Sequence, residues 1–240
     1  MNENKDESLI THLEALRETL LKCIISLGVM LPVALIAAPK CLNLLIDIII
    51  SDSKVTLNFF SPAEVFIIQI KTALVLDLII CFPYIAKKIW DFILPALYEN
   101  ERKFIKNTVF ISTFLFVCGA AFCIFVILPL VIKFGLSFSS QNINPMFGIS
   151  NIINLMLMMS VAFGLMFQMP LITNALIKSG VISYESVSNL RSYVFVVILI
   201  IAAILTPPDV VSQLMLGIPT YLLFELGLLF SKGVKNENNE

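Results

Sequence analysis

Six long apolar segments, separated by shorter polar stretches, dominate the pattern of hydrophobic and polar positions along the chain. A helix needs roughly 20 mostly apolar residues to cross the hydrocarbon core of a bilayer. The pattern therefore predicts an all-α integral membrane protein with six transmembrane helices. We expect them at Leu20–Ala38, Val65–Ala86, Thr108–Ile132, Ile152–Ile177, Ser192–Leu205 and Val210–Ser231.

The basic residues between these segments predict the orientation of the helices, because Lys and Arg are enriched in cytoplasmic loops. One set of loops and ends carries twelve such residues: Lys5, Arg17, Lys22, Lys87, Lys88, Arg102, Lys103, Lys106, Lys178, Arg191, Lys232 and Lys235. The opposite set carries three: Lys40, Lys54 and Lys133. We therefore expect both termini to be cytoplasmic, with residues 1–19 as an amphipathic entry and residues 232–240 as a tail.

The last two helices are predicted to be short. The fifth segment spans about 21 Å at a rise of about 1.5 Å per residue, against a hydrocarbon core of about 30 Å. The sixth has only the stretch Val210–Phe224 before Glu225. Such a hairpin either thins the bilayer beside it or lies buried among neighbouring helices, and the sequence leaves both alternatives open.

Composition supports the membrane class and excludes others. The chain of 240 residues is 58% hydrophobic and 14% charged, with a mean hydropathy of +0.94, whereas soluble domains are about 45–50% apolar and about 25% charged. A net charge of −1 gives no bulk field for nucleic acid. We expect one polytopic domain over residues 1–240, with no cleavable signal peptide because residues 1–19 are acidic.

Cofactor, metal and catalytic chemistry are not predicted. The five cysteines lie in or beside apolar segments without the spacing of metal ligands, and His12 is the one histidine. Hydrolase and protease motifs such as HExxH and GxSxG are absent from the sequence.

Several motifs, taken in order, resemble one family along nearly the whole chain. They are THLEALRETLL near the N-terminus, SPAEVFIIQIK at Ser61–Lys71, the loop with Pro83, Trp90, Phe92, Pro95, Leu97, Tyr98, Glu101 and Arg102, FGLMFQMP at Phe163–Pro170, LTPPDVVSQ at Leu205–Gln213, and IPTYLLFELG at Ile218–Gly227. The chain thereby resembles TatC, the receptor subunit of the twin-arginine protein translocase. The resemblance implies a non-enzymatic receptor in the cell (inner) membrane, or an organelle membrane, that binds twin-arginine signal peptides on the cytoplasmic face.

Further partners follow from the same resemblance. It implies small single-span partner subunits of the TatA and TatB type and self-association in a larger complex. It also implies export of folded proteins, driven by the proton-motive force.

The resemblance also implies a signal-peptide site. Glu101 matches a carboxylate of that site, and arginine–carboxylate pairs are frequently bidentate. Phe92 is expected to pack against the signal's apolar part, while Trp90 is expected to be an interfacial anchor. At the N-terminus Arg17 matches the family, but its usual glutamate is Ala15 here. Glu14 or Glu18 can stand in for it, or both belong to a solvated acidic face.

A second implied site contacts partner helices. Gln168 stands where many relatives carry glutamate, so a proton-carrying role is not expected, and a polar contact to a partner helix is. Gln213, Thr206 and Asp209 are assigned to the same kind of contact, although Asp209 is also placed to cap the sixth helix.

The competing hypothesis is a proton-coupled solute transporter. Lys71 and Asp77 lie within the second apolar segment, and ionisable residues inside a membrane are functional candidates by default. Transporters commonly show internal repeats and paired broken helices, and we find neither in the sequence.

Overall fold

The computed structural model is almost entirely helical and describes residues 3–53, 57–93, 102–137, 146–178, 180, 182–205 and 210–232. Its helices are α1 Glu3–Ser53, α2 Pro62–Ile93, α3 Arg102–Phe122, the π-helical turn η1 Cys123–Ile127, α4 Leu128–Leu136, α5 Ile149–Met166, α6 Met169–Lys178, α7 Tyr184–Asn189, α8 Arg191–Leu205 and α9 Val210–Lys232. Two short strands, β1 Leu57–Asn58 and β2 Phe147–Gly148, pair in parallel.

The predicted spans are present. By length and composition, five helices of the described chain can cross a membrane, counting α3 to α4 as one and α5 to α6 as one. A shorter apolar helix, Arg191–Ile204, corresponds to the fifth segment. The short fifth helix is therefore confirmed: α8 has 15 residues. Helix α9 has 23 residues, and its uncharged part, Val210–Phe224, is the short stretch that the sequence indicates.

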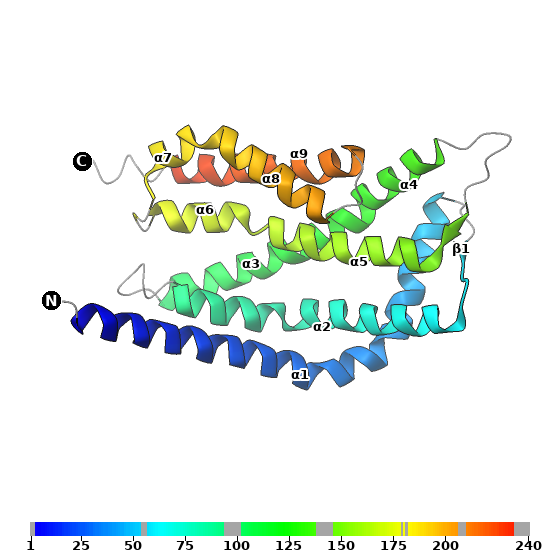
Figure 1. Ribbon diagram of the computed structural model, residues 1–240, viewed down its shortest axis with the longest axis horizontal. Coiled ribbons are helices and arrows are strands. Elements are labelled where there is room, and N and C mark those ends of the chain that lie inside the picture. Colours follow the sequence, from blue (N-terminus) through cyan, green and yellow to red (C-terminus); the bar gives the residue numbers. More distant parts are fainter. Residues whose placement is uncertain are drawn as a thin grey trace.

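Three predicted spans were too short or too regular. Helix α1 is 51 residues long, contains Pro32 and Pro39, and continues past Ala38 to Ser53. It bends upward in its last third (Figure 1). Prolines kink a helix where a backbone hydrogen bond is lost. The third span widens into η1 ahead of Pro129. The fourth is broken at Phe167 and Gln168, just before Pro170, as the proline predicts.

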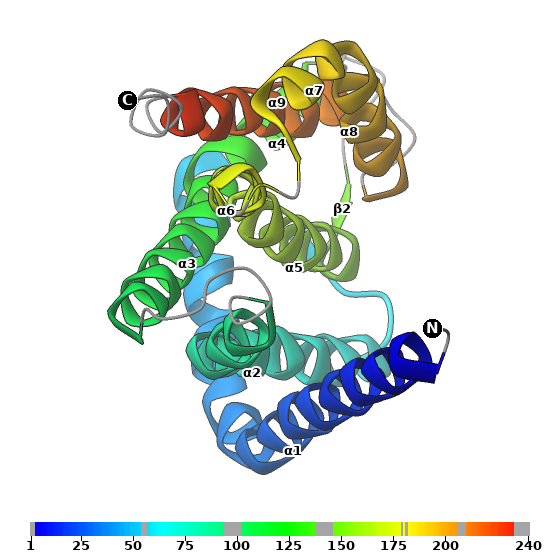
Figure 2. The same cartoon turned by 90° about the vertical axis from the view of Figure 1, so that its left-hand side faces the viewer.

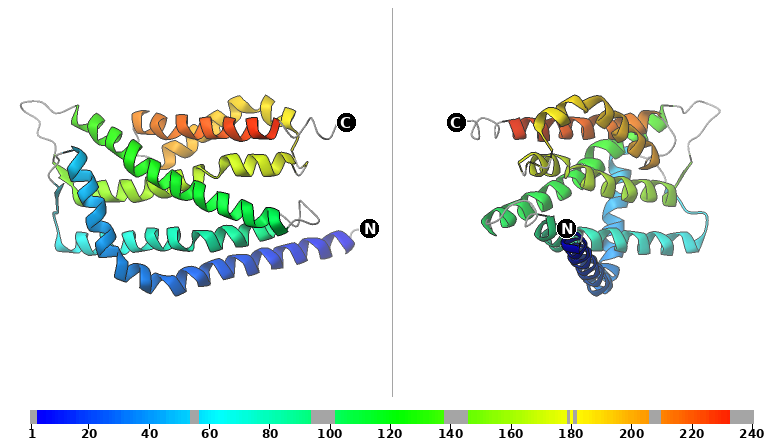
Figure 3. Two further views of the ribbon diagram at one scale, coloured as in Figure 1. Left: turned by 180° about the vertical axis from the view of Figure 1, so that it is seen from behind. Right: turned by 60° about the vertical axis from the view of Figure 1, so that its left-hand side comes forward.

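The helices form a row rather than a closed bundle. Helix α1 packs on α2, α2 on α3 and α5, α6 on α9, and α9 on α8. Seen along the long axis, α1 and α2 lie on one side and α8 and α9 on the other, with α3, α5 and α6 between them (Figure 2). From behind, α3 and α4 cross the other helices obliquely (Figure 3).

A close crossing of α3 and α5 forms the centre of the molecule. A Cβ atom on Gly119 would lie 2.6 Å from the backbone oxygen of Phe163, and one on Gly164 would lie 2.6 Å from the ring of Phe116. Phe116 in turn stacks on Phe82 of α2, with ring centroids 3.8 Å apart. The two glycines therefore allow three helices to meet at one point.

The outer surface of the helices is apolar. Large side chains such as Ile36 on α1, Phe110 on α3 and Phe230 on α9 are 82%, 74% and 68% exposed. A water-soluble protein rarely exposes apolar patches of this extent. Together with the helix lengths, this surface makes the chain a multi-pass membrane protein.

Candidate functional site

One end of the molecule gathers most of the predicted signal-peptide residues. Helix α1 begins there, α2 and α6 end there, α3 begins there, and α9 ends there (Figure 1). We call it the termini end. The other end, where α2 and α5 begin beside β1 and β2, is the opposite end. The α8–α9 hairpin stops well short of the opposite end in the same view.

Glu14 and Glu18 lie about three and four turns into α1 from the termini end. Glu14, Arg17 and Glu18 are all exposed. Glu18 forms an ion pair with Lys22 one turn later, and Lys88 of α2 lies near enough to attract the same carboxylate. Among the described side chains, Glu14 has no ion pair. The structure therefore brings Glu18 beside the last turns of α2, while Glu14 is more open to a partner.

The end of α2 carries the aromatic residues. Phe92 is half-buried in the last turn of the helix. Trp90 is only 5% exposed and packs with Phe82, Ala86 and Phe116, so its assignment as an interfacial anchor was wrong. Its indole is part of the helix contact because α2, α3 and α6 converge there. Glu101 lies outside the described residues.

A cavity of about 350 Å³ opens beside these aromatic residues. Its wall is apolar apart from Ser112 and Gln168; the other lining residues are Phe82, Ala86, Ile89, Trp90, Ile93, Leu165, Ile172, Ala175 and Leu176. They come from α2, α3, α5 and α6. The cavity can hold an apolar group but offers little to a charged one.

Gln168 lies at the break between α5 and α6 and is held by the protein itself. Its Oε1 accepts a hydrogen bond from Ser112 Oγ at 2.6 Å, and its Nε2 donates to the Ser112 backbone oxygen at 3.0 Å. A longer contact of 3.4 Å reaches the Gly164 oxygen. With 7% of its surface exposed, the amide ties α3 to α5. A contact to a partner helix stays a prediction, and one that must compete with these bonds.

The other partner-contact residues lie at the α8–α9 hairpin. Gln213 is half-buried, and its Nε2 donates to the Leu199 oxygen at 3.0 Å, so it joins α9 to α8. Thr206 and Asp209 lie outside the described residues. At the other end of the hairpin, Glu225 forms an ion pair with Arg191, whose Nε lies 3.1 Å from the carboxylate, and accepts a hydrogen bond from Tyr221 Oη at 3.0 Å. Glu225 thus has the structural role that its place near the helix end indicates.

The two charges of the transporter hypothesis do not meet. Lys71 donates to Asn154 Oδ1 of α5 at 2.9 Å. Asp77 is 2% exposed and accepts from Cys81 Sγ at 3.6 Å on the side facing α1. The two residues therefore form no relay in the described structure, and the transporter hypothesis loses the arrangement that it needs. Nor do three or more His, Cys, Asp or Glu side chains gather in a metal-binding group anywhere in the described part.

Glu64, at the opposite end, belongs to the motif Ser61–Lys71 that resembles the family, but the sequence indicated no role for it. One carboxylate oxygen accepts from the Phe60 backbone nitrogen at 2.8 Å and the other from the Ser150 nitrogen at 3.2 Å. Glu64 thus binds amides at the N-termini of both α2 and α5, where helix dipoles favour an anion. The spacing Ser61-x-x-Glu64 is that of a capping box. This spacing indicates that Glu64 binds the backbone at the start of α2, but it does not indicate the bond to Ser150 of α5.

Comparison with known proteins agrees with this architecture. The model of the family described as Sec-independent protein translocase protein (TatC) matches residues 11–219. The chain is 34% identical to TatC of Carboxydothermus hydrogenoformans over 234 residues, which cover 97% of this chain and 96% of that one. It is also 34% identical to TatC of Haemophilus influenzae, over all of this chain and 94% of the relative.

A solved structure gives the same result at the level of the fold. The crystal structure of the twin-arginine translocase receptor TatC in DDM superimposes with a TM-score of 0.85 at 34% identity, covering 92% of this chain and 99% of that chain. Sequence and fold agree over nearly the full length of both proteins. The chain is a multi-pass membrane protein that belongs to the TatC family, the translocase component of Sec-independent protein transport.

Proposed function

We propose that the protein is the receptor that binds twin-arginine signal peptides at its termini end, on the cytoplasmic side of a bacterial inner membrane. Acidic residues of α1 and the half-buried Phe92 lie at this end, and Trp90 and Ile93, the neighbours of Phe92 in α2, line an apolar cavity. This combination is the observation that carries the proposal. It fits a peptide with two guanidinium groups followed by an apolar stretch.

Each part of such a peptide has a counterpart. Glu101, in the loop after α2, accepts one guanidinium, and Glu14 or Glu18 accepts the other, oriented by Arg17. The apolar stretch packs against Phe92 and enters the cavity, whose two polar groups already satisfy each other. Burial of apolar surface then adds to charge-assisted hydrogen bonds.

The orientation that the proposal requires rests on charge. By sequence, twelve Lys and Arg residues belong to the loops and ends on the side of the termini and three to the opposite set, which favours a cytoplasmic termini end. Small single-span subunits of the TatA and TatB type then contact the α8–α9 side through Gln213, Thr206 and Asp209, and Gln168 when it exchanges its bond to Ser112. Folded cargo crosses the membrane with these subunits, driven by the proton-motive force.

Photocrosslinking from an aromatic probe placed at Phe92, which leaves the Glu101 carboxylate in place, tests the receptor role. We expect a peptide with Arg-Arg to crosslink in membranes, and one with Lys-Lys to crosslink at least tenfold less, because lysine cannot pair in bidentate fashion. In the same probe background, Glu101→Ala should reduce the yield and Glu99→Ala, the matched acid between α2 and α3, should not. Equal labelling of both peptides would contradict the proposal and leave only the family assignment.

A further inference from the structure

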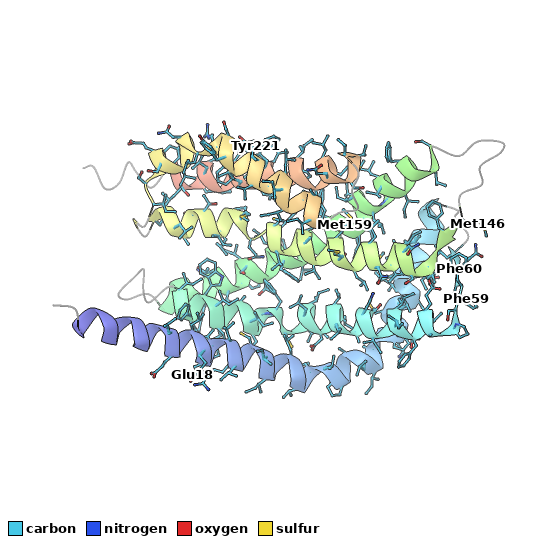
Figure 4. All side chains as sticks on the ribbon, in the orientation of Figure 1. Glu18, Phe59, Phe60, Met146, Met159 and Tyr221 are labelled. Atoms are coloured by element: carbon cyan, nitrogen blue, oxygen red, sulfur yellow. The ribbon has the colours of Figure 1, made fainter. Side chains whose placement is uncertain are left out.

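The opposite end carries a small, strongly exposed apolar rim, which we define as Phe59, Phe60 and Met146. These side chains are 64%, 71% and 72% exposed. Two of them follow β1 and the third precedes β2, so segments almost 90 residues apart in sequence contribute to one surface. Figure 4 shows all three at the end of the molecule away from Glu18.

The backbone beneath the rim is fixed by four kinds of contact. Leu57 pairs with Phe147 and Asn58 with Gly148 in the parallel bridge. The Phe60 nitrogen donates to Glu64 at 2.8 Å, and the Glu64 nitrogen donates to the Ser61 oxygen at 3.0 Å. The Phe60 ring lies so close to Gly148 that a Cβ atom there would be 3.1 Å from Cε2. The backbone beneath the rim and the Phe60 ring are therefore held in position.

The polar groups next to the rim are already satisfied. Both oxygens of Glu64 are used inside the fold, by the Phe60 and Ser150 nitrogens. Lys71 is turned toward Asn154 of α5. The rim itself is apolar, with the exposed polar residues Ser61 and Asn151 beside it, and an exposed apolar surface is favoured when something other than water covers it.

The rim continues directly into the lipid-facing side of α2. Exposed apolar residues follow at helical spacing from Phe66, at 64%, through Ile70 at 37% to Leu74 at 51%. Exposed apolar side chains are thus found from the middle of a membrane-spanning helix to the segment that precedes it, with the small exposed residues 61–63 between Phe60 and the helical part. Because lipid covers the helical part, this continuity identifies lipid as the cover of the rim.

We propose that Phe59, Phe60 and Met146 form a membrane anchor that inserts into the interfacial layer of the leaflet opposite the chain termini. Aromatic side chains are enriched at this depth of transmembrane proteins. A rim fixed to the starts of both α2 and α5 sets how deeply this end lies in the bilayer. The proposal does not depend on which side of the membrane is cytoplasmic.

Tryptophan fluorescence at the rim tests the proposal in the full-length chain. Trp90 is the single native tryptophan, so Phe60→Trp and Met146→Trp are made with Trp90→Phe and reconstituted into phosphatidylcholine and phosphatidylglycerol vesicles. We expect blue-shifted emission, quenched at least twofold more by a nitroxide at the headgroup than by bromines deep in the acyl chain. Phe114→Trp, at a lipid-exposed site of α3 that is 61% exposed, should show the reverse order.

Other outcomes overturn the proposal. Emission near that of free tryptophan, quenched by aqueous iodide and by neither lipid, would place the rim in water. Emission that shifts only when a nanodisc holds two copies instead of one would assign the surface to a second copy of this chain. If the Trp90→Phe chain does not fold, difference spectra of Phe60→Trp with Trp90 retained give the same readings.

Discussion

Gln168 is a neutral amide at the break between α5 and α6, and its surroundings explain how the fold uses it. The sequence allowed us to identify the residue as exceptional within an apolar segment. It did not identify Ser112, 56 residues earlier, as its partner, because a single serine in an apolar helix carries no signal of what it faces. The prediction that Trp90 is an interfacial anchor was wrong for the same reason, because an aromatic residue near a helix end is compatible with either a membrane interface or a buried helix contact.

The Gln168–Ser112 pair should be measurable as a coupling energy. Gln168→Leu leaves the Ser112 hydroxyl without its buried acceptor, and Ser112→Ala leaves the amide oxygen without its donor, so each should destabilise the protein by about 1–2 kcal/mol. The double variant should lose less than the sum, with a coupling of about 0.6–1.7 kcal/mol. Unfolding in detergent micelles measures the stability of the unchanged protein, the two single variants and the double variant, which together give the coupling energy. Strict additivity would show that the 2.6 Å bond contributes nothing.

At the scale of elements, the sequence predicts which segments form helices, but it does not predict where these helices end. Apolar length alone indicated all six segments, because backbone groups in lipid must be satisfied within helices. Helix α1 nevertheless runs 15 residues beyond Ala38, past Pro39 and the charges Lys40 and Asp47. Charges that normally mark the end of a span do not end a helix. The break before Pro170 was predictable because proline removes a donor.

Glycines at helix crossings supply a prediction with an internal control. In Gly119→Ala the new methyl group would lie 2.6 Å from the Phe163 backbone oxygen, and backbone cannot move aside cheaply. We expect a loss of about 1–3 kcal/mol from overpacking. Gly28→Ala on α1 meets nothing within 4 Å and should be neutral or stabilise by up to about 1 kcal/mol.

Thermal unfolding of both variants in the same detergent checks this expectation. Equal melting temperatures for Gly119→Ala and Gly28→Ala would mean that α3 and α5 separate easily, contrary to the close crossing.

The arrangement of the whole molecule is beyond what the sequence pattern can specify. Six lipid-facing helices can pack in many orders, and the row from α1 to α8 depends on contacts such as Gly227 against Pro170, where a Cβ atom would lie 2.6 Å away. The cavity depends on the angles between four helices, so no local motif indicates it. The topology of the ends, in contrast, follows the distribution of basic residues and agrees with the shared termini end in Figure 1.

Glu64 should stabilise the whole molecule more than another glutamate does. Its carboxylate binds amides at two helix N-termini, and hydrogen bonds to a charged group contribute about 1.5–3 kcal/mol when buried. Glu64 is half-buried, so we expect Glu64→Gln to cost about 1–2 kcal/mol. Glu225→Gln removes a carboxylate that is 24% exposed and paired with an arginine that is 41% exposed, and should cost less than about 1 kcal/mol.

Hydrogen exchange separates the two effects. In Glu64→Gln the Phe60 and Ser150 amides should exchange faster together, whereas in Glu225→Gln they should not change. If only Phe60 responds, the carboxylate caps α2 alone and does not join the two helices.

The link between Glu64 and Ser150 also has a consequence for biogenesis. The two residues are 86 positions apart, and ribosomes add about 5–20 residues per second. Synthesis of Ser150 therefore follows that of Glu64 by on the order of 4–17 s. During this time the second carboxylate oxygen of Glu64 lacks its hydrogen-bond donor, because α5 has not yet been made. During that interval α1 and α2 are an unfinished hairpin in the membrane, and an insertase or chaperone has a defined window in which to hold it.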